Sequence, residues 1–261
     1  MLVEQRYQKI IELLKADGSV RASALKNKLD VSSETIRRDL ENMENQGMLR
    51  RTRGGAFLNE NYGMSETNSI YTPFGVRDQK HIDKKKEIAE FALSFIKDGQ
   101  SIALDSGTTA YALAKAMKSR FNNLTVITNS MVIANELADT KGITLIVTGG
   151  VYSPEESAFV SDIAGLIFEK INVDIFFLTT CGISVEKGVT YQRMDEIFVQ
   201  EKMMDAASRT VAIADSSKLG TNSLVKMCDV NRISMVITDS NAKEEQIKPF
   251  EKAGIPVKKL S

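Results

Sequence analysis

The residues best placed to do chemistry in this chain are two neighbouring arginines, Arg37 and Arg38, in the segment VSSETIRRDL that spans residues 31–40. A guanidinium group can donate two parallel hydrogen bonds to a guanine edge. Apolar side chains recur at helical spacing, at positions 36, 40 and 43, so one face of the segment must be buried and the arginines turn outward. The pattern predicts a recognition helix whose first turn enters the major groove of double-stranded DNA, and it leaves the order of the two arginines open.

A second basic segment follows this helix. Residues 48–57 read MLRRTRGGAF, which predicts a short β-hairpin, or wing, with three arginines before a glycine pair. The alternative for Arg37 and Arg38 is a solvated helix face, on which they pair with residues one turn away such as Glu34 and Glu41. The basic hairpin favours DNA binding, because its arginines would have an electrostatic role beside DNA and have little structural role in a hairpin. The candidate DNA-contacting residues are Ser33, Glu34, Thr35, Arg37, Arg38, Arg50, Arg51 and Arg53.

Three short helices are expected to position these side chains. Apolar positions from Tyr7 to Leu14 predict a first helix that ends at Asp17–Gly18, and residues 23–29 predict a second. Ser32 or Ser33 can cap the third helix by accepting a backbone N–H bond worth about 1 kcal/mol, and Gly47 can end it. Short connections between three helices, followed by a hairpin, predict a winged helix-turn-helix domain over residues 1–57.

Charge is distributed unevenly along a chain that is neutral as a whole. The first 55 of the 261 residues carry 11 lysines and arginines against 8 aspartates and glutamates, whereas the remainder carries 23 against 26. The basic part is therefore the part with the DNA-like pattern. The length favours two domains, and a hydrophobic content of 43% is ordinary for a globular protein.

Few residues are available for other kinds of site. Cys181 and Cys228 are too far apart for a paired metal-ligand spacing and too few for a disulfide framework, so we expect two thiols in a reducing cytoplasm. His81 is the single histidine and lies among charged residues, which predicts a solvated side chain. The first residues lack the layout of a signal peptide, and no apolar run approaches about 18 residues. We expect a cytoplasmic protein without a membrane partner, cofactor or metal.

The rest of the chain predicts a linker and a second domain. Residues 58–76 show no sustained period and are rich in Asn, Ser, Thr and Gly, as in a linker. Residues 84–96 then predict an amphipathic helix. Short apolar segments that alternate with helical patterns follow at residues 101–104, 124–127, 143–147, 174–178, 211–214 and 234–237. The predicted fold class of residues 77–261 is therefore α/β, with a largely parallel sheet covered on both faces.

Small polar residues follow these predicted strands. Hydroxyl side chains and glycines let backbone N–H groups approach an anion, and the loop after residue 104 leads into a helix whose N-terminus favours negative charge. Parallel strands gather their carboxyl ends at one edge of a sheet, so the loops together predict a phosphate-binding site. Lys218 can add a positive charge, and Asp105 and Asn129 can bond sugar hydroxyls. The candidates are Asp105, Ser106, Gly107, Thr108, Thr109, Thr128, Asn129, Gly149, Gly150 and Lys218.

The quoted segments resemble the DeoR family of bacterial transcriptional regulators. The resemblance rests on VSSETIRRDL and RTRGGA in the first domain, and on DSGTT, TNS, a glycine pair and DSSK in the second. It implies a sensor domain with the fold of ribose-5-phosphate isomerase, and a regulator, commonly a repressor of a sugar-use operon, with a phosphorylated sugar as effector. It also implies Lys85 and Arg77 as weaker effector-site candidates. Cys181 stands where many members of this family have a polar residue. It either tunes ligand choice or packs in the interior.

Two other functions are compatible with parts of the pattern. An active sugar-phosphate isomerase fused to a DNA-binding module would need an acid and a base, and Asp195, Glu196 and Glu201 could serve. The stretch EKGVTYQRMDE, residues 186–196, lacks the glycine run of that enzyme, so we expect no catalytic residues. A DNA-architectural protein would not need aligned polar loops. One small winged helix contacts few base pairs, so we expect a homodimer or a higher homo-oligomer on operator DNA.

Overall fold

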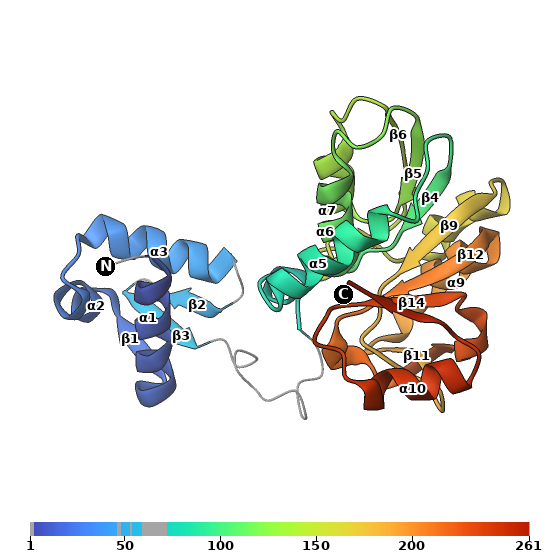
Figure 1. The fold of residues 1–261 in the computed structure, drawn as a ribbon. Helices are drawn as coiled ribbons and strands as arrows, with labels where there is room; N and C mark the ends of the chain where they lie inside the picture. Colours follow the sequence, from blue (N-terminus) through green and yellow to red (C-terminus); the bar gives the residue numbers. More distant parts are fainter. Residues whose placement is uncertain (1–2, 46–47, 53, 59–71, 261) are drawn as a thin grey trace. The chain divides into compact units, whose positions relative to one another are not determined.

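The computed structural model describes residues 3–45, 48–52, 54–58 and 72–260. The chain divides into two compact units, Met1–Gln79 and Lys80–Ser261, which we call the head and the sensor unit (Figure 1). The head contains, in chain order, α1 (Val3–Asp17), β1 (Ser19–Arg21), α2 (Ala22–Leu29), α3 (Ser33–Asn45), β2 (Leu49–Thr52), β3 (Gly55–Leu58) and α4 (Phe74–Asp78).

The head is a winged helix-turn-helix unit, as the sequence predicts. Helices α1, α2 and α3 bury one apolar cluster that includes Ile10, Leu14, Leu25, Ile36 and Leu40. These positions recur every three to four residues within each helix, so each helix contributes one face to the cluster. The predicted stop at Gly47 lies outside the described residues, whereas the turn at Gly18 is present with a φ of 71°.

The wing is a three-stranded antiparallel sheet in the order β1-β3-β2. Strand β1 has only three residues, which is too short for a visible period, and the sequence analysis did not predict it. It lies so close to β3 that a Cβ atom at Gly55 would be 1.9 Å from the carbonyl oxygen of Val20. Glycine at position 55 is therefore required for this approach of two backbones.

The predicted linker, residues 58–76, lies mainly outside the described residues. Its described end differs from the prediction, because α4 begins at Phe74 within it. Pro73 precedes the first turn with a φ of −55°, which suits the start of a helix. A helix of five residues is too short to show a period in the sequence.

The sensor unit is built on a seven-stranded sheet in the order β15-β14-β12-β9-β4-β5-β6, and all its neighbouring strands are parallel. The strands are β4 (Ser101–Leu104), β5 (Leu124–Thr128), β6 (Ile143–Val147), β9 (Val173–Leu178), β12 (Ala207–Ile213), β14 (Met235–Thr238) and β15 (Val257–Lys259). The six strands predicted from the sequence are all present. The short final strand, β15, was not predicted.

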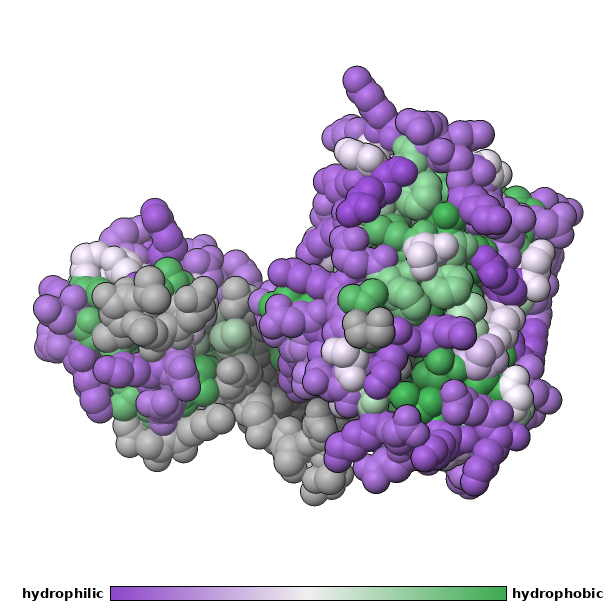
Figure 2. Space-filling model, in the orientation of Figure 1, coloured by the Kyte–Doolittle hydropathy of each residue, from purple (hydrophilic) through white to green (hydrophobic). Residues whose placement is uncertain are grey.

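Helices cover both faces of this sheet, and side chains alternate between the two faces. Ile102, Leu104 and Phe177 join one apolar cluster with α5 (Ile82–Leu93), α6 (Thr108–Met117) and α7 (Met131–Leu137). Ala103 and Phe176 join the other cluster, which includes side chains of α9 (Met194–Ala206) and α10 (Glu244–Lys252). Figure 2 shows apolar residues in the middle of one side of the sensor unit and hydrophilic residues around them. The fold class predicted from the sequence is confirmed.

Smaller elements complete the second face. A three-stranded antiparallel sheet contains β10 (Gly182–Ser184), β11 (Gly188–Tyr191) and β13 (Val225–Cys228). A hairpin of β7 (Tyr152–Ser153) and β8 (Ala158–Phe159) lies beyond β6 and is followed by α8 (Asp162–Gly165). Three 3-10 turns are η1 (Leu166–Glu169), η2 (Ser216–Lys218) and η3 (Val230–Arg232). The short strands carry no clear alternation in sequence, so none of them was predicted.

Candidate functional site

Helix α3 presents a polar first turn and a basic second turn to solvent. Ser32 caps the helix, because its Oγ accepts a hydrogen bond from the backbone N–H of Thr35 at 3.0 Å. The same Oγ lies 2.8 Å from Oγ1 of Thr35, which links the two hydroxyls. Ser33 and Glu34 are exposed, and Thr35 is half-buried. The first turn is therefore held in a fixed shape with its polar atoms at the surface.

The two arginines of α3 differ in their ion pairs. Arg37 is paired with Glu34 at 2.7 Å and with Glu41 at 3.2 Å, and its hydrogen bond lowers the pKa of the Glu34 carboxyl. Arg38 is exposed and makes no ion pair with any other described residue. Arg37 thus realises the solvated-face alternative, whereas Arg38 has its guanidinium available for a base or a phosphate.

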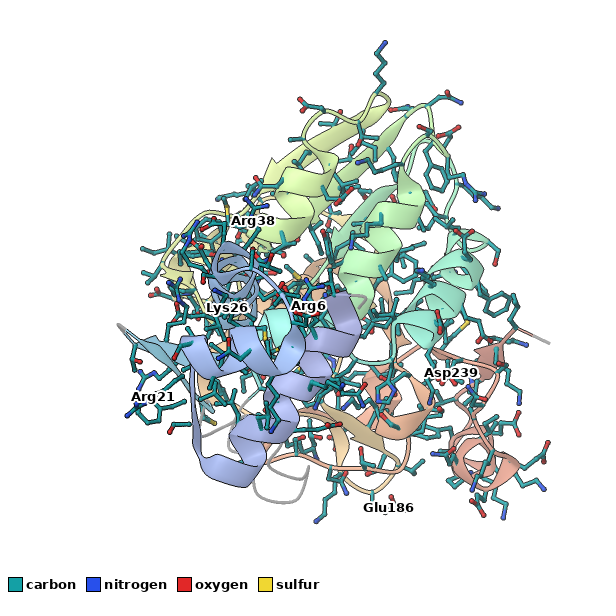
Figure 3. All side chains as sticks on the ribbon, turned by 90° about the vertical axis from the view of Figure 1, so that its left-hand side faces the viewer. Arg6, Arg21, Lys26, Arg38, Glu186 and Asp239 are labelled. Carbon is teal, nitrogen blue, oxygen red and sulfur yellow. The ribbon has the colours of Figure 1, made fainter. Side chains whose placement is uncertain are left out.

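A buried ion pair anchors α3 to α1. Arg6 donates from Nε to Oδ2 of Asp39 at 2.7 Å and from Nη2 to Oδ1 at 3.0 Å. Arg6 is 9% exposed and Asp39 is 4% exposed, and Figure 3 shows Arg6 among the helices of the head. Both oxygens of the carboxylate are therefore used to fix the helix that carries Arg38. This role of Asp39 could not be predicted from the sequence, because it depends on a residue 33 positions away.

The wing adds basic side chains on its outward face. Arg50 and Thr52 of β2 are exposed, and so is Arg21 of β1, which projects from the head in Figure 3. Arg51 is half-buried, and its backbone N–H donates to Oε1 of Glu44 at 2.7 Å, which ties the wing to α3. Arg53 lies outside the described residues. Arg21 is a basic residue that the sequence analysis did not select.

We expect Arg38→Ala to weaken binding to a DNA site selected from a random pool by about 1–3 kcal/mol, because it removes an unengaged guanidinium. Arg37→Ala is the matched control and should cost less, since Glu34 and Glu41 already neutralise that charge. Fluorescence anisotropy at one fixed salt concentration measures both. A larger loss for Arg37→Ala would assign the main contact to the other arginine.

The candidate effector residues lie at one edge of the seven-stranded sheet. Thr128 ends β5, and the others lie in the segments that follow β4, β5, β6 and β12. Because these strands and β9 are parallel to one another, their carboxyl ends lie at the same edge. The chain passes from β4 to β5 and β6 on one side and later returns to β9 on the other side of β4. Such a reversal of strand order is where open α/β sheets bind ligands. The loops after β4 and β9 flank this point.

Asp105 is buried beneath these loops and is fully hydrogen-bonded by the protein itself. Its carboxylate accepts from the backbone N–H groups of Gly107 and Thr179, both at 3.0 Å, and from Oγ1 of Thr179 at 2.8 Å. The hydroxyl of Tyr191 donates to it at 3.3 Å. Burial raises the pKa of Asp105, although these hydrogen bonds oppose that shift. Asp105 therefore joins the ends of β4 and β9 and acts as a positioning residue.

The loop after β4 carries the most open polar groups. Gly107 touches the neighbouring loop, since a Cβ atom there would be 1.9 Å from Oγ1 of Thr179. Gly107 is also the N-cap of α6 and supplies no side-chain cap, so the first N–H groups of this ten-residue helix remain without one. Ser106, Thr108 and Thr109 are each 7% exposed, and no hydrogen bond links their hydroxyls to another described residue. These atoms can receive an anion.

The residues after β5 and β6 are engaged within the protein. Oγ1 of Thr128 accepts from the backbone N–H of Ser130 at 3.1 Å, and Nδ2 of Asn129 donates to the carbonyl oxygen of Phe159 at 2.9 Å. Oδ1 of Asn129 is buried without a hydrogen bond from the described residues. Gly149 has open space beside it, whereas a Cβ atom at Gly150 would be 2.8 Å from Oγ of Ser161. Gly150 therefore has a packing reason of its own.

A cluster at the ends of β12 and β14 includes residues that the sequence analysis missed. Nζ of Lys84 donates to Oγ of Ser216 at 2.8 Å and lies 3.8 Å from Oδ1 of Asp239. Burial opposes ionisation of Asp239, yet bonds from Ser216 and the charge of Lys84 lower its pKa. Asp239 directly follows Thr238, which ends β14, so its position after a strand was a signal available in the sequence. Lys218 lies at the same edge, is half-buried and forms no ion pair with a described residue.

The weaker candidates have different surroundings. Lys85 is buried on α5, whereas Arg77 belongs to α4 in the head. Cys181 packs against the apolar cluster that contains Tyr191 and Cys228, which favours its packing role. Burial raises the pKa of the Cys228 thiol to about 11, so this thiol stays protonated near neutral pH.

We expect Asp105→Asn to destabilise the sensor unit by about 1–3 kcal/mol at neutral pH, because the new amide group would face a backbone N–H that has lost its acceptor. Urea unfolding followed by circular dichroism measures this loss. Since the pKa of Asp105 is raised on folding, its carboxyl favours folding below the usual aspartate pKa of about 3.9, and that contribution is lost as pH rises through the raised value. The asparagine variant should lack this part of the pH dependence. Unchanged stability at neutral pH would contradict the positioning role.

Comparison with known proteins places both units in one family. Residues 6–62 match the family model of the DeoR-like helix-turn-helix domain, and residues 80–240 match that of the DeoR C terminal sensor domain. The HTH-type transcriptional regulator GolR of Listeria innocua is 33% identical over 254 residues, which cover 97% of each chain. A putative aga operon transcriptional repressor of Escherichia coli O157:H7 is 32% identical over 97% of this chain and 92% of its own.

Among solved structures, ribose 5-phosphate isomerase of Methanocaldococcus jannaschii is 16% identical, with a TM-score of 0.40 over 53% of this chain and 55% of that chain. The sequence relatives are transcriptional regulators, so the isomerase alternative is not favoured. In the described part of the chain, no helix has the length and apolar character needed to cross a membrane. The chain belongs to the DeoR family and is a transcriptional regulator that joins a helix-turn-helix DNA-binding domain to a DeoR-type sensor domain.

Proposed function

We propose that the protein represses a sugar-use operon and that a phosphorylated sugar controls its affinity for operator DNA. The observation that carries the effector assignment is the loop after β4, where an uncapped helix N-terminus and three unengaged hydroxyls lie at the reversal of strand order. A phosphate can accept from several such donors at once. The aga operon repressor among the relatives supports repression as the direction of control.

The residues of this edge take different roles in the proposal. Ser106, Thr108 and Thr109 bind the phosphate, together with the first N–H groups of α6. Asp105 and Thr128 are fully buried and hold the loops in place. Asn129 has a buried Oδ1 that can accept from a sugar hydroxyl, and Lys218 supplies a positive charge at the edge of the site.

The head recognises DNA in this proposal through α3 and the wing. Arg38 contacts bases, whereas Arg50 and Arg21 contact phosphates on the strands that flank the groove. Two copies bind one operator, with half-sites about one helical turn apart or a multiple of it. The effector favours one of two arrangements of the sensor unit, and a differential affinity of about 1–3 kcal/mol would change operator affinity about 5- to 150-fold. We expect the protein to act in the cytoplasm, where it would meet operator DNA.

A thermal-shift screen tests the effector class. Sugar phosphates are compared with the same sugars without phosphate, and a ligand at about 100 times its dissociation constant should add about 2.7 kcal/mol to stability. The proposal expects stabilisation by at least one phosphorylated member and by none of the unphosphorylated counterparts. Equal stabilisation by a sugar and its phosphate would remove the phosphate assignment.

A further inference from the structure

The two edge strands of the sensor sheet differ in charge. The last strand of one edge, β15, has the sequence VKK, and Lys258 and Lys259 are exposed on it. The last strand of the other edge, β6, has the sequence ITLIV and lies at the rim of the sheet in Figure 1. Lysines on an edge strand oppose pairing with another chain. The sheet is protected in this way at β15 and unprotected at β6.

Strand β6 also has unused backbone groups. Strands β5 and β6 are parallel, Leu124 of β5 pairs with Ile143, and the backbone N–H of Leu124 donates to the carbonyl oxygen of Gly142. Backbone groups alternate in direction along a strand, so Thr144 and Ile146 also direct their N–H and C=O groups to β5. Leu145 and Val147 therefore direct theirs outward, and no hydrogen bond joins these groups to another described residue. Another extended strand is the element that can form hydrogen bonds with a row of outward-facing N–H and C=O groups.

Apolar side chains surround this free edge. Val147 is 39% exposed, and Val151 and Tyr152 in the next segment are 61% and 45% exposed. Ile163 and Leu166 are 54% and 56% exposed, and their segment contacts the same loop, since the backbone N–H of Val151 donates to Oγ of Ser161 at 3.1 Å. We call Val147, Val151, Tyr152, Ile163 and Leu166, with the outer edge of β6, the edge surface. Exposed apolar groups of this kind mark protein–protein contacts.

The charge pattern favours a second copy of this chain as the occupant of this edge. Antiparallel pairing of a strand with its own copy places residues at equal distances from the two-fold axis opposite each other, so a charge at the axis would meet its own like charge. No charged residue occurs from Gly142 to Ser153, although 26% of the chain is charged. The segment is thus free of like-charge repulsion in self-pairing.

We propose that two copies pair through β6 about a two-fold axis at Leu145, which joins the two sheets into one. Leu145 donates to the carbonyl of Leu145 of the partner subunit, and Val147 donates to the carbonyl of Ile143 of the partner subunit. On either side of the axis, the side chain of Val147 packs against Ile143 of the partner subunit. Because β6 leads directly into Gly149, the interface adjoins the proposed effector site. This inference rests on the proposal that two copies bind one operator.

The test compares self-association of the full chain without DNA by sedimentation equilibrium. Thr144 and Val147 are both exposed, so Thr144→Lys/Val147→Lys should fold and should raise the dissociation constant of the dimer by about 30-fold or more, as at an interface hot spot. Leu224→Lys is the matched control, because Leu224 is 85% exposed outside the edge surface, and it should leave the constant unchanged. An unchanged dimer in the double variant, or a comparable loss in the control, overturns the interface.

Cross-linking tests the axis itself and keeps the proposal falsifiable if the lysine variant fails to fold. Hydrogen-bonded antiparallel pairs have Cα atoms about 5.5 Å apart, which lies within the disulfide range of about 4.4–6.8 Å. Leu145→Cys should therefore cross-link under mild oxidation, whereas Lys258→Cys on the opposite edge and the unsubstituted chain should not. Absence of the Leu145→Cys cross-link in a dimeric protein overturns the axis. A monomeric unsubstituted chain overturns the interface and the dimer, whereas the effector screen, which needs no dimer, tests the sensor assignment separately.

Discussion

Replacing Asp39 by alanine is expected to destabilise the head by about 3–5 kcal/mol, the usual cost of breaking a buried ion pair by removing one of its members. Arg6 of α1 donates two hydrogen bonds to the carboxylate of Asp39 in α3, at 2.7 and 3.0 Å. Hydrogen exchange followed by mass spectrometry should show faster exchange in α1 and α3 and unchanged exchange in the sensor sheet. DNA binding should fall along with the folded fraction of the head.

The double variant Arg6→Met/Asp39→Leu is the matched control for this loss. It removes both charges and restores apolar packing, so the head should regain most of its stability. Arg38 is unchanged in this variant, and DNA binding should return as the head refolds. A double variant as unstable as Asp39→Ala would show that the specific geometry of the ion pair, rather than an unpaired charge, accounts for the loss.

Thr108→Asp is expected to abolish the response to the effector while leaving DNA binding intact. The new carboxylate would lie in the first turn of α6, where the helix dipole stabilises a negative charge, so the sensor unit should fold. It would occupy the place proposed for the phosphate and repel that group. The effector should therefore leave the operator affinity of this variant unchanged, whereas it is proposed to change that of the unsubstituted protein about 5- to 150-fold. Operator titration with and without the effector measures the response.

Thr108→Asn separates charge from shape at the same position. Asparagine has nearly the same size as aspartate, and it carries no negative charge to repel a phosphate. A weakened but measurable response is expected for Thr108→Asn. If the aspartate variant responds as the unsubstituted protein does, the phosphate does not bind at the start of α6.

The regular parts of the fold could be predicted because their patterns are local. The apolar period of α3 fixed which residues face the interior, and continuous apolar strands indicated a sheet covered on both faces. Short elements such as β1, α4 and the β7–β8 hairpin have too few residues for a period. Their positions depend on contacts with distant segments, as at Gly55 and Val20.

The candidate site could likewise be predicted only in part. Residue type and strand ends sufficed to select the loop after β4, since hydroxyls and glycines there have a recognisable chemistry. Residue type could not distinguish Asp105, whose four donors come from three segments of the chain, from a residue that meets a ligand. The same holds for Arg37 and Arg38, which are adjacent in sequence and differ in the ion pairs that they form.

The most direct test of the proposed function is the affinity of the full chain for its operator, measured at one salt concentration with and without each phosphorylated sugar. The account predicts that one phosphorylated sugar changes this affinity by about 5- to 150-fold and that its unphosphorylated counterpart does not. The same sugar should have no effect on the Thr108→Asp variant. Operator affinity that no phosphorylated sugar changes, across a panel that includes every ligand found to stabilise the protein, would contradict the account.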